Sequence, residues 1–418
     1  MANEEIITAL DIGTGKIFGI SCLVRDTGIE VLATNIMNFS ENEDIVRKGR
    51  IADIEEVSTC IFDVLKALEN ESGEWPALVN IGLGGGHVKG ILFPRSIDIE
   101  PKGREINNTD VQLLKKEIKT AISAAHGQGR QVLCSIPQDY IIDNVNLVKN
   151  PSGMHGNLLE IKVHVITADI NPVQDIRNCI KKAGSQLESI YPHSWAAAAS
   201  TLSDEEKKLG CLLVDIGKGT TDIAFFSDNS ILLTDSIKLG GENIDRDISK
   251  VLHTPVSYAG ELKEKHAFAN YPHLMKEKNP VLDEAVEIFD LSGKLSTKVT
   301  RGKISHIVHA RTMEILEDFV RRKVEKTFLL HSCGAGIIIS GGGARLKGIN
   351  HLASEIFGLP ARTGIPRGLL NLDKSFQSPE FASALGTVIL ASKQDRKKGK
   401  TGFLQKFKGI ASIPQKWF

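Results

Sequence analysis

Two short stretches carry the residues best suited to bind a phosphate group. "ALDIGTGK" at 9–16 and "LVDIGKGT" at 213–220 each place an aspartate and Ile-Gly-x-Gly between apolar runs. Apolar runs on both sides of a turn are typical of paired strands. The glycines allow positive φ, and such a turn can point successive N–H groups at an anion. We therefore expect two β-hairpins whose tips bind phosphate, with Asp11 and Asp215 facing a Mg²⁺ ion through water.

A third glycine cluster, Gly341–Gly343, follows an apolar strand and precedes a helix start. A turn of this kind lets a flat ligand or a phosphate approach the backbone closely. The "GTGK" at 13–16 is not a Walker A loop, because Leu10 replaces the first glycine of that motif and Ile17 replaces its Ser/Thr. Two hairpins and a later glycine turn predict a nucleotide held between two related halves.

This arrangement resembles the actin, Hsp70 and hexokinase superfamily of ATP-binding proteins. "GGENIDRDI" at 240–248 resembles its Gly-Gly segment near the ribose, and "ELKEKHA" at 261–267 resembles the segment whose Lys and Glu contact the nucleoside. The resemblance implies a duplicated α/β fold with ATP and Mg²⁺ as cofactors. The expected nucleotide-binding residues are Asp11, Gly13, Thr14, Gly15, Lys16, Asp215, Gly217, Lys218, Gly219, Thr220, Thr221, Gly240, Gly241, Glu242, Asn243, Lys263, Glu264, Gly341, Gly342, Gly343 and Arg345.

The segment between the hairpins narrows the resemblance. "NIGLGGGHVKGI" (80–91), "IPQDYIIDN" (136–144) and the Pro-x-Gly-Met-x-Gly element at 151–156 resemble the extra subdomain of the bacterial cell-division family FtsA. The spacing of apolar residues there predicts a helix with Asn108 or Thr109 as its N-cap and a half-buried strand over 158–168. The resemblance implies an actin-like, two-domain fold in which this subdomain takes the place of actin subdomain 1B.

The family's architecture implies a subdomain order along the chain. The expected boundaries are 1–83 for the first part of subdomain 1A, 84–166 for the FtsA-type subdomain 1C, 167–195 for 1A continued, 196–245 for subdomain 2A, 246–320 for subdomain 2B, 321–360 for 2A continued, 361–392 for the return to 1A, 393–402 for a basic linker and 403–418 for a membrane-targeting amphipathic helix.

Two positions depart from the superfamily pattern. Lys218 stands in the second hairpin where the family usually has glycine. The helix start at 191–201 lacks the Glu or Gln with which many superfamily ATPases orient water, and His193 is either a substitute or part of an ordinary helix cap. Because a water-positioning group is part of fast phosphoryl transfer to water, we assign no catalytic residue and expect slow or no turnover.

The charge of the chain is distributed unevenly. Its 418 residues contain 51 Lys and Arg and 51 Asp and Glu, but residues 393–418 contain eight basic residues and one acidic residue, a net charge of +7. The six scattered cysteines favour a reducing cytosol over a disulfide framework. The acidic N-terminus predicts no signal peptide, and no apolar run is long enough to span a membrane.

The basic tail predicts a membrane anchor. Residues 393–402 have the composition of a flexible linker. A helix after them would carry an apolar stripe beside cations and would end near Ile413, before Pro414. Such a segment lies in the headgroup layer of an anionic membrane, so we expect this partner rather than nucleic acid. The residues expected to contact it are Phe403, Leu404, Lys406, Phe407, Lys408, Ile410, Trp417 and Phe418.

The resemblance also implies a binding site for the C-terminal tail of the tubulin-like protein FtsZ, in subdomain 2B. An acidic and apolar tail needs a basic groove with an apolar floor, and residues 294–316 have the composition for one. The expected cations are Lys298, Arg301, Lys303 and Arg311, and the floor is expected from Ile304, Ile307 and Val308.

The sequence therefore favours a membrane-tethered, actin-like adaptor of cell division. The FtsA resemblance implies filaments under the cytoplasmic face of the inner membrane at the division site, with other division proteins bound through subdomain 1C. Two alternatives stay open: an enzyme of the same fold, either a small-molecule kinase or an Hsp70-like ATPase, and a pilus-assembly relative of FtsA.

Overall fold

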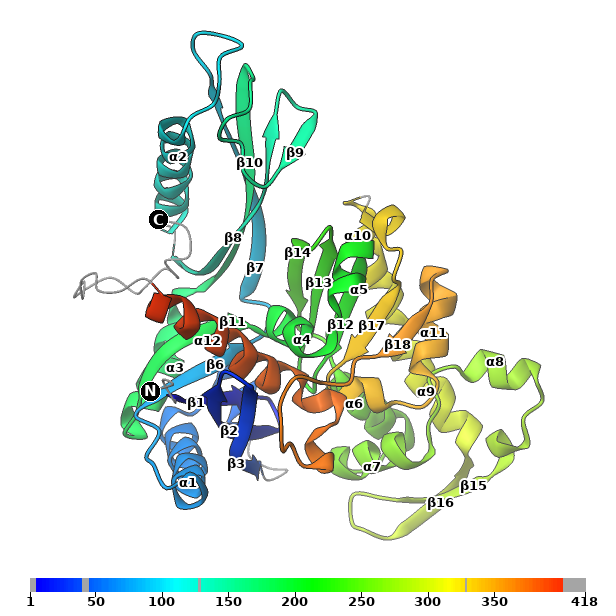
Figure 1. Cartoon of the computed structure of the whole chain (residues 1–418). Coiled ribbons are helices and arrows are strands. Elements are labelled where there is room, and N and C mark those ends of the chain that lie inside the picture. Colours follow the sequence, from blue (N-terminus) through cyan, green and yellow to red (C-terminus); the bar gives the residue numbers. More distant parts are fainter. Residues whose placement is uncertain (1–4, 40–44, 127–128, 328, 401–418) are drawn as a thin grey trace.

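The molecule is built from two halves with the same sheet topology (Figure 1). The fold is that of a computed structural model, which describes residues 5–39, 45–126, 129–327 and 329–400. In the first half the sheet has the order β11-β6-β1-β2-β3. Its strands are β1 (Glu5–Ile12), β2 (Lys16–Arg25), β3 (Gly28–Asn38), β6 (Leu78–Leu83) and β11 (Gln186–Pro192).

The sheet of the second half repeats this plan in the order β14-β13-β12-β17-β18. In each half three consecutive antiparallel strands are extended by two parallel strands that come later in the chain. The predicted duplication is thereby confirmed. The strands are β12 (Cys211–Ile216), β13 (Thr221–Ser227), β14 (Ser230–Ile237), β17 (Ile337–Ser340) and β18 (Ala361–Thr363).

Helices cover both faces of the first sheet. Helix α1 (Ile54–Ser72) begins where Asp53 accepts a hydrogen bond from the Glu56 N–H and ends at Gly73, which has a φ of 79°. Its buried stripe packs with α3 (Ile170–Lys182) on one face. Helix α12 (Ala382–Lys400) packs on the other face with β1 and β2.

Helix α4 (His193–Thr201) and α12 join the two halves. Residues of α4 contact β12 and β13 of the second sheet, while α12 lies on the first sheet. The helices cross so closely that a Cβ at Gly386 would lie 1.7 Å from the carbonyl oxygen of Ala196. A glycine at this crossing brings the two halves into direct backbone contact.

An arm projects from the first half (Figure 1). Its sheet has the order β7-β10-β8-β9 and one covering helix, and its apolar core is separate from the others. Neither predicted N-cap, Asn108 or Thr109, caps helix α2: the side-chain oxygen of Asn107 accepts from the Thr109 and Asp110 N–H groups, and the helix begins at Asn108. The elements are β7 (Val88–Asp98), α2 (Asn108–His126), β8 (Arg130–Ile142), β9 (Asn146–Val148) and β10 (Leu158–Asp169).

The second half carries its own outer unit, which has a separate apolar core. Its elements are α6 (Gly241–Leu252), α7 (Val256–His266), α8 (Tyr271–Lys276), β15 (Ala285–Phe289), β16 (Leu295–Thr300) and α9 (Arg301–Met313). The rest of the half consists of the sheet with α5 (Asp204–Leu209), a π-helical stretch (Glu314–Arg321), α10 (Arg322–Glu325) and α11 (Ile349–Phe357).

The C-terminal segment differs from the expectation in one respect. Residues 393–400, predicted as part of a flexible linker, continue α12. Lys, Arg and Gln are good helix formers, and here they follow a helix that is already anchored by packing. The predicted amphipathic segment at 403–418 lies outside the described residues. Within the described part of the chain, no helix has the length and apolar character needed to cross a membrane.

Candidate functional site: a cleft between the two halves

The cleft between the halves has a volume of about 820 Å³. Both predicted hairpins, the start of α6, α7 and the Gly341–Gly343 turn contribute to its wall. All but three of the residues predicted to bind nucleotide line it. The exceptions support the wall from behind: the Thr221 hydroxyl donates to Leu239 O, and Asn243 Oδ1 accepts from the N–H of Gly240.

The two hairpin tips face each other across the cleft and nearly touch. A Cβ at Gly15 would lie 2.8 Å from Lys218 Cδ, and a Cβ at Gly219 would lie 2.6 Å from Thr14 Oγ1. None of the four tip glycines adopts positive φ. The predicted reason for these glycines is therefore corrected: Gly15 and Gly219 allow the close approach of the opposite hairpin, while Gly13 and Gly217 lie against the backbone of their own hairpins. Lys218 also has no positive φ, so the position accepts a side chain.

Three aspartates and one histidine meet at the base of the hairpins. Asp11 and Asp215 end β1 and β12, and Asp222 lies opposite Asp215 on β13. His193, the first residue of α4, places Nε2 3.1 Å from Asp11 Oδ1. Asp11 Oδ1 is buried and has no aligned hydrogen-bond partner, although it faces the His193 imidazolium, with which a hydrated cation would share it. The residues present at this position fit a magnesium ion.

Burial and the neighbouring charges shift the pKa values of this group. Burial raises the pKa of Asp215 to about 7, helped by the charges of Asp222 and Asp11 and opposed by His193. Burial also raises the pKa of Asp222. For Asp11, His193 and a hydrogen bond from Ser383 outweigh burial, and its pKa is lowered. For His193, the three carboxylates outweigh burial and raise its pKa to about 9. The carboxylates and the imidazolium thus form one coupled charge cluster.

Two cations of the cleft, Lys16 and Arg345, are held by Glu380. Lys16 Nζ lies 3.7 Å from Glu380 Oε2 and 4.0 Å from the centre of the Phe381 ring, and Arg345 Nη1 lies 3.2 Å from Glu380 Oε2. Burial lowers the pKa of Lys16 in spite of Glu380 and Asp11. Both cations line the cleft and can reorient toward an anionic ligand.

Helix α7 contributes charged side chains to the wall of the cleft. Lys263 pairs with Asp245 at 2.7 Å, and Glu264 lies beside it in the wall. Gly341 has a φ of 75°, and a Cβ there would lie 2.4 Å from Asp215 Oδ1. The Gly341–Gly343 turn therefore contacts the Asp215 carboxylate directly. Because it has no side chains, it presents bare backbone to the cleft.

Sequence reasoning missed three residues of the site, Asp222, Glu380 and Ser383, and left the role of His193 open. Asp222 had a signal, because a hairpin that pairs Ile216 with Thr221 must place Asp222 opposite Asp215. His193 was considered, but the sequence could not decide between the cleft and a helix cap. Glu380 and Ser383 belong to no recognisable sequence motif. They reach the cleft only because the chain returns to the first half at the start of α12.

The predicted FtsZ-tail groove needs correction. Ile304 and Val308 are fully buried in the core of the outer unit, so they cannot form the floor of an open groove. Arg301 pairs with Glu284 at 2.7 Å and lies over the Phe268 ring. The remaining predicted cations differ in availability: Lys298 pairs with Glu287 on the surface, Lys303 is exposed, and Arg311 is bound by Asp247 and Glu314.

The chain is similar to known proteins along its whole length. Profiles described as "SHS2 domain inserted in FTSA" and "Cell division protein FtsA" match residues 85–167 and 212–386. A cell division protein FtsA of Borreliella burgdorferi is 31% identical, over 100% of this chain and 98% of the relative. The chain belongs to the FtsA family. An FtsA of Pseudomonas aeruginosa is 29% identical over 92% of this chain and 89% of its own length.

Comparison with solved structures of other proteins shows that this chain has the actin-like fold. A PilM-PilN type IV pilus biogenesis complex superposes with a TM-score of 0.63 at 16% identity, covering 92% of this chain and 98% of the neighbour. MreB5 of Spiroplasma citri, solved bound to ADP, gives a TM-score of 0.58 at 17% identity, covering 95% and 99%. The predicted fold class, including the FtsA-type insert, is confirmed over the described residues.

Proposed function

We propose that this chain binds ATP with Mg²⁺ in the cleft and acts as a nucleotide-dependent, membrane-bound adaptor of cell division. The observation that carries the proposal is the pair of Asp-headed hairpins whose tips face each other in one cleft. Glycine-rich tips and nearby lysines suit phosphates, and the nucleoside end has polar side chains on α7.

The residues of the cleft have separate roles in this proposal. The hairpin tips and Lys16 bind and orient the phosphates, while Asp11 and Asp215 hold the water shell of Mg²⁺. The ion supplies charge neutralisation of the phosphates when it is bound. Lys263 and Glu264 contact the nucleoside, and Gly341–Gly343 support the base. We propose slow turnover, since no Glu or Gln starts α4.

The test compares two aspartates. Asp215→Ala removes a buried carboxylate of the cleft, whereas Asp63→Ala removes an exposed carboxylate of α1. We expect Asp215→Ala to weaken Mg²⁺-dependent ATP binding at least tenfold in a calorimetric titration and Asp63→Ala to leave it unchanged. Equal ATP affinity of the Asp215→Ala protein and the unmodified protein in the presence of Mg²⁺ would contradict the assignment.

The membrane part of the proposal concerns residues 403–418, on the cytoplasmic face of the inner membrane at the division site. Phe403→Glu and Phe407→Glu each put a charge on the apolar stripe, where burial of the ring contributes about 1.5–3 kcal/mol. We expect both to abolish flotation with anionic liposomes. Gln405→Glu introduces the same charge off the stripe, and it should reduce flotation only slightly. Flotation that survives both Phe substitutions would show that the tail is not the anchor.

The partner in this proposal is the acidic C-terminal tail of FtsZ. Arg301 and Arg311 are mostly buried in their ion pairs, whereas Lys298, which pairs with Glu287 on the surface, and Lys303 are exposed and serve as the candidate contacts. A hydrogen bond to a charged group contributes about 1.5–3 kcal/mol. The double variant Lys298→Glu, Lys303→Glu should therefore bind an FtsZ tail peptide at least tenfold more weakly by fluorescence anisotropy. Unchanged affinity would move the site elsewhere.

Self-association completes the proposal. The family resemblance implies filaments, and head-to-tail contacts between copies that do not close into a ring generate open filaments. We propose that filaments form on the membrane and that other division proteins bind the arm built from β7–β10 and α2. Electron microscopy of the protein on anionic lipid with ATP tests this, and an absence of filaments at all nucleotide states would contradict it.

A further inference from the structure

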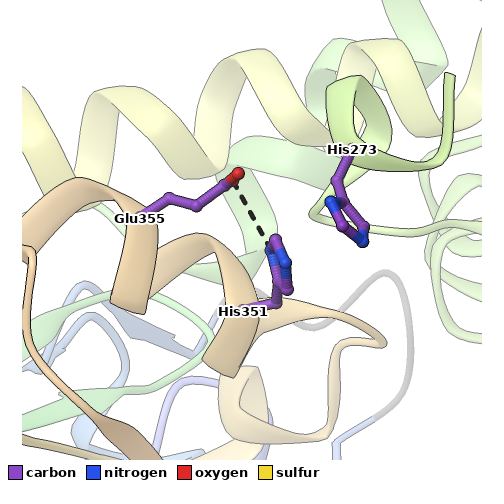
Figure 2. A group of neighbouring side chains, drawn as sticks. All are labelled: His273, His351 and Glu355. Atoms are coloured by element: carbon purple, nitrogen blue, oxygen red, sulfur yellow. Dashed lines mark ion pairs between the residues drawn. The ribbon is translucent and has the colours of Figure 1, made fainter. Parts of the chain in front are cut away.

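A cluster of three potential metal ligands lies away from the cleft, between α8 and α11 (Figure 2). His273 belongs to α8, and His351 and Glu355 lie one turn apart on α11. The ligand atoms of the three side chains lie within 4.8 Å of one another. Figure 2 shows the two imidazole rings side by side, with Glu355 reaching toward His351.

We propose that His273, His351 and Glu355 form a binding site for a divalent transition metal ion and that Zn²⁺ is the ion that suits it best. Imidazole nitrogens and a carboxylate oxygen are ordinary zinc ligands, and three protein ligands leave one tetrahedral position for water. Tetrahedral coordination places ligand atoms about 3.3 Å apart. The three side chains are partly exposed, so small rotations about their side-chain bonds bring the atoms to that separation.

The contacts of the two histidines favour a bound cation. The ring centroids of His273 and His351 are 4.0 Å apart. The Nδ1 atom of His351 is buried and has no aligned hydrogen-bond partner, although Glu355 Oε2 lies 3.5 Å away. A second carboxylate, Glu277, lies 3.2 Å from His273 Nε2. Carboxylates that hold the other nitrogen of a ligating histidine orient the ring and strengthen metal binding.

The backbone beneath the cluster is held in place. The Ala269 N–H donates to the carbonyl oxygen of Lys347, and a Cβ at Gly348 would lie 1.9 Å from Asn270 Oδ1. The loops that start α8 and α11 are therefore in contact just before the ligands. Fixed supports of this kind reduce the conformational entropy that the ligand side chains lose when they bind a metal ion.

The ion would connect two units of the second half. Helix α8 packs on α9, whose apolar residues belong to the core of the outer unit. Helix α11 belongs to the core under the second sheet. Ile349 of α11 also lines the cleft, two residues before His351. Zinc at this position therefore joins the outer unit to the sheet and fixes one wall of the cleft.

Calorimetric titration of the untagged, chelator-treated full chain with ZnCl₂ tests the site. We expect each chain to bind one Zn²⁺ ion. The affinity for Zn²⁺ should fall tenfold or more in His273→Ala and in His351→Ala. Glu355→Gln should weaken it less, because the amide oxygen remains a potential ligand. His331→Ala removes an exposed histidine outside the cluster and should change nothing.

Thermal unfolding provides an independent measurement. An ion that binds only the folded chain raises Tm, so ZnCl₂ should stabilise the unmodified protein and the His331→Ala variant but not the double variant His273→Ala, His351→Ala. Zinc affinity and thermal shift that are equal in the double variant and the unmodified protein would overturn the proposal. The proposal is independent of the nucleotide, since Asp215→Ala should leave zinc binding intact.

Discussion

Arg311 and Asp247 form a two-pronged ion pair between α9 and α6: Nε lies 2.6 Å from Oδ2, and Nη2 lies 3.1 Å from Oδ1. Glu314 binds the same guanidinium from the following helical turn. Hydrogen bonds to Asp247 and the nearby carboxylates raise the pKa of Arg311. The arginine therefore holds two helices together within the outer unit. Its guanidinium is already engaged and is not available to an acidic peptide such as the FtsZ tail.

Replacing Arg311 should reduce stability more than it changes partner binding. Arg311→Ala leaves Asp247 without its partner in a half-buried position, and we expect the free energy of unfolding to fall by about 1–3 kcal/mol. Lys303→Ala, on the exposed face of the same helix, should change it by less than about 0.5 kcal/mol. Urea denaturation of the two variants measures both values. Equal stability of both variants would show that the ion pair contributes nothing.

The glycines of the 341–343 turn should differ sharply in their tolerance of alanine. At Gly341 the φ of 75° and the 2.4 Å approach of a Cβ to Asp215 Oδ1 both oppose a side chain. At Gly342 no atom lies within 4 Å of a Cβ. We expect Gly341→Ala to lower Tm by several degrees and Gly342→Ala to leave it nearly unchanged. A similar Tm for the two proteins would contradict the geometry of the turn.

The hairpins could be predicted from the sequence because their signal is local. Apolar strands and an Asp-x-Gly turn are read from one short stretch, and the repeat of the stretch indicates the duplication. The buried state of Ile304 could not be predicted, because the same helical spacing fits a core face or a groove floor. Glu380 and Ser383 lie outside any motif, and their contacts depend on where α12 returns in space. Tertiary contacts of this kind leave no periodic pattern in the chain.

Acid should destabilise the contact between the arm and the second half. His164 of β10 is buried and lies 2.9 Å from Thr234 Oγ1 of β14, and burial lowers its pKa to about 4. Between pH 6.5 and 4 the unfolded chain binds a proton at this position while the folded chain does not. The stabilisation is therefore complete above pH 6.5 and is lost as pH falls toward 4, by at most about 3 kcal/mol.

The variant His164→Gln isolates this effect, since glutamine does not titrate and can still bond Thr234. We expect the free energy of unfolding of His164→Gln to fall less steeply than that of the unmodified protein between pH 6.5 and 4. His331→Gln removes an exposed histidine and should keep the original slope. The measurement is urea denaturation at a series of pH values. Parallel curves for His164→Gln and the unmodified protein would remove His164 as the cause.

At the crossing of α4 and α12, the substitution Gly386→Ala tests the packing by whether it raises or lowers Tm. Gly386 lies inside α12, and alanine in a helix interior is more stable than glycine by about 1 kcal/mol when nothing else changes. A Cβ at Gly386, however, would lie 1.7 Å from the carbonyl oxygen of Ala196, and both are backbone-fixed. Gly386→Ala must therefore push α4 away from α12 and open the contact between the halves. We expect the variant to lower Tm and to weaken ATP binding in the cleft, and a raised Tm would show that the two helices are not in close contact.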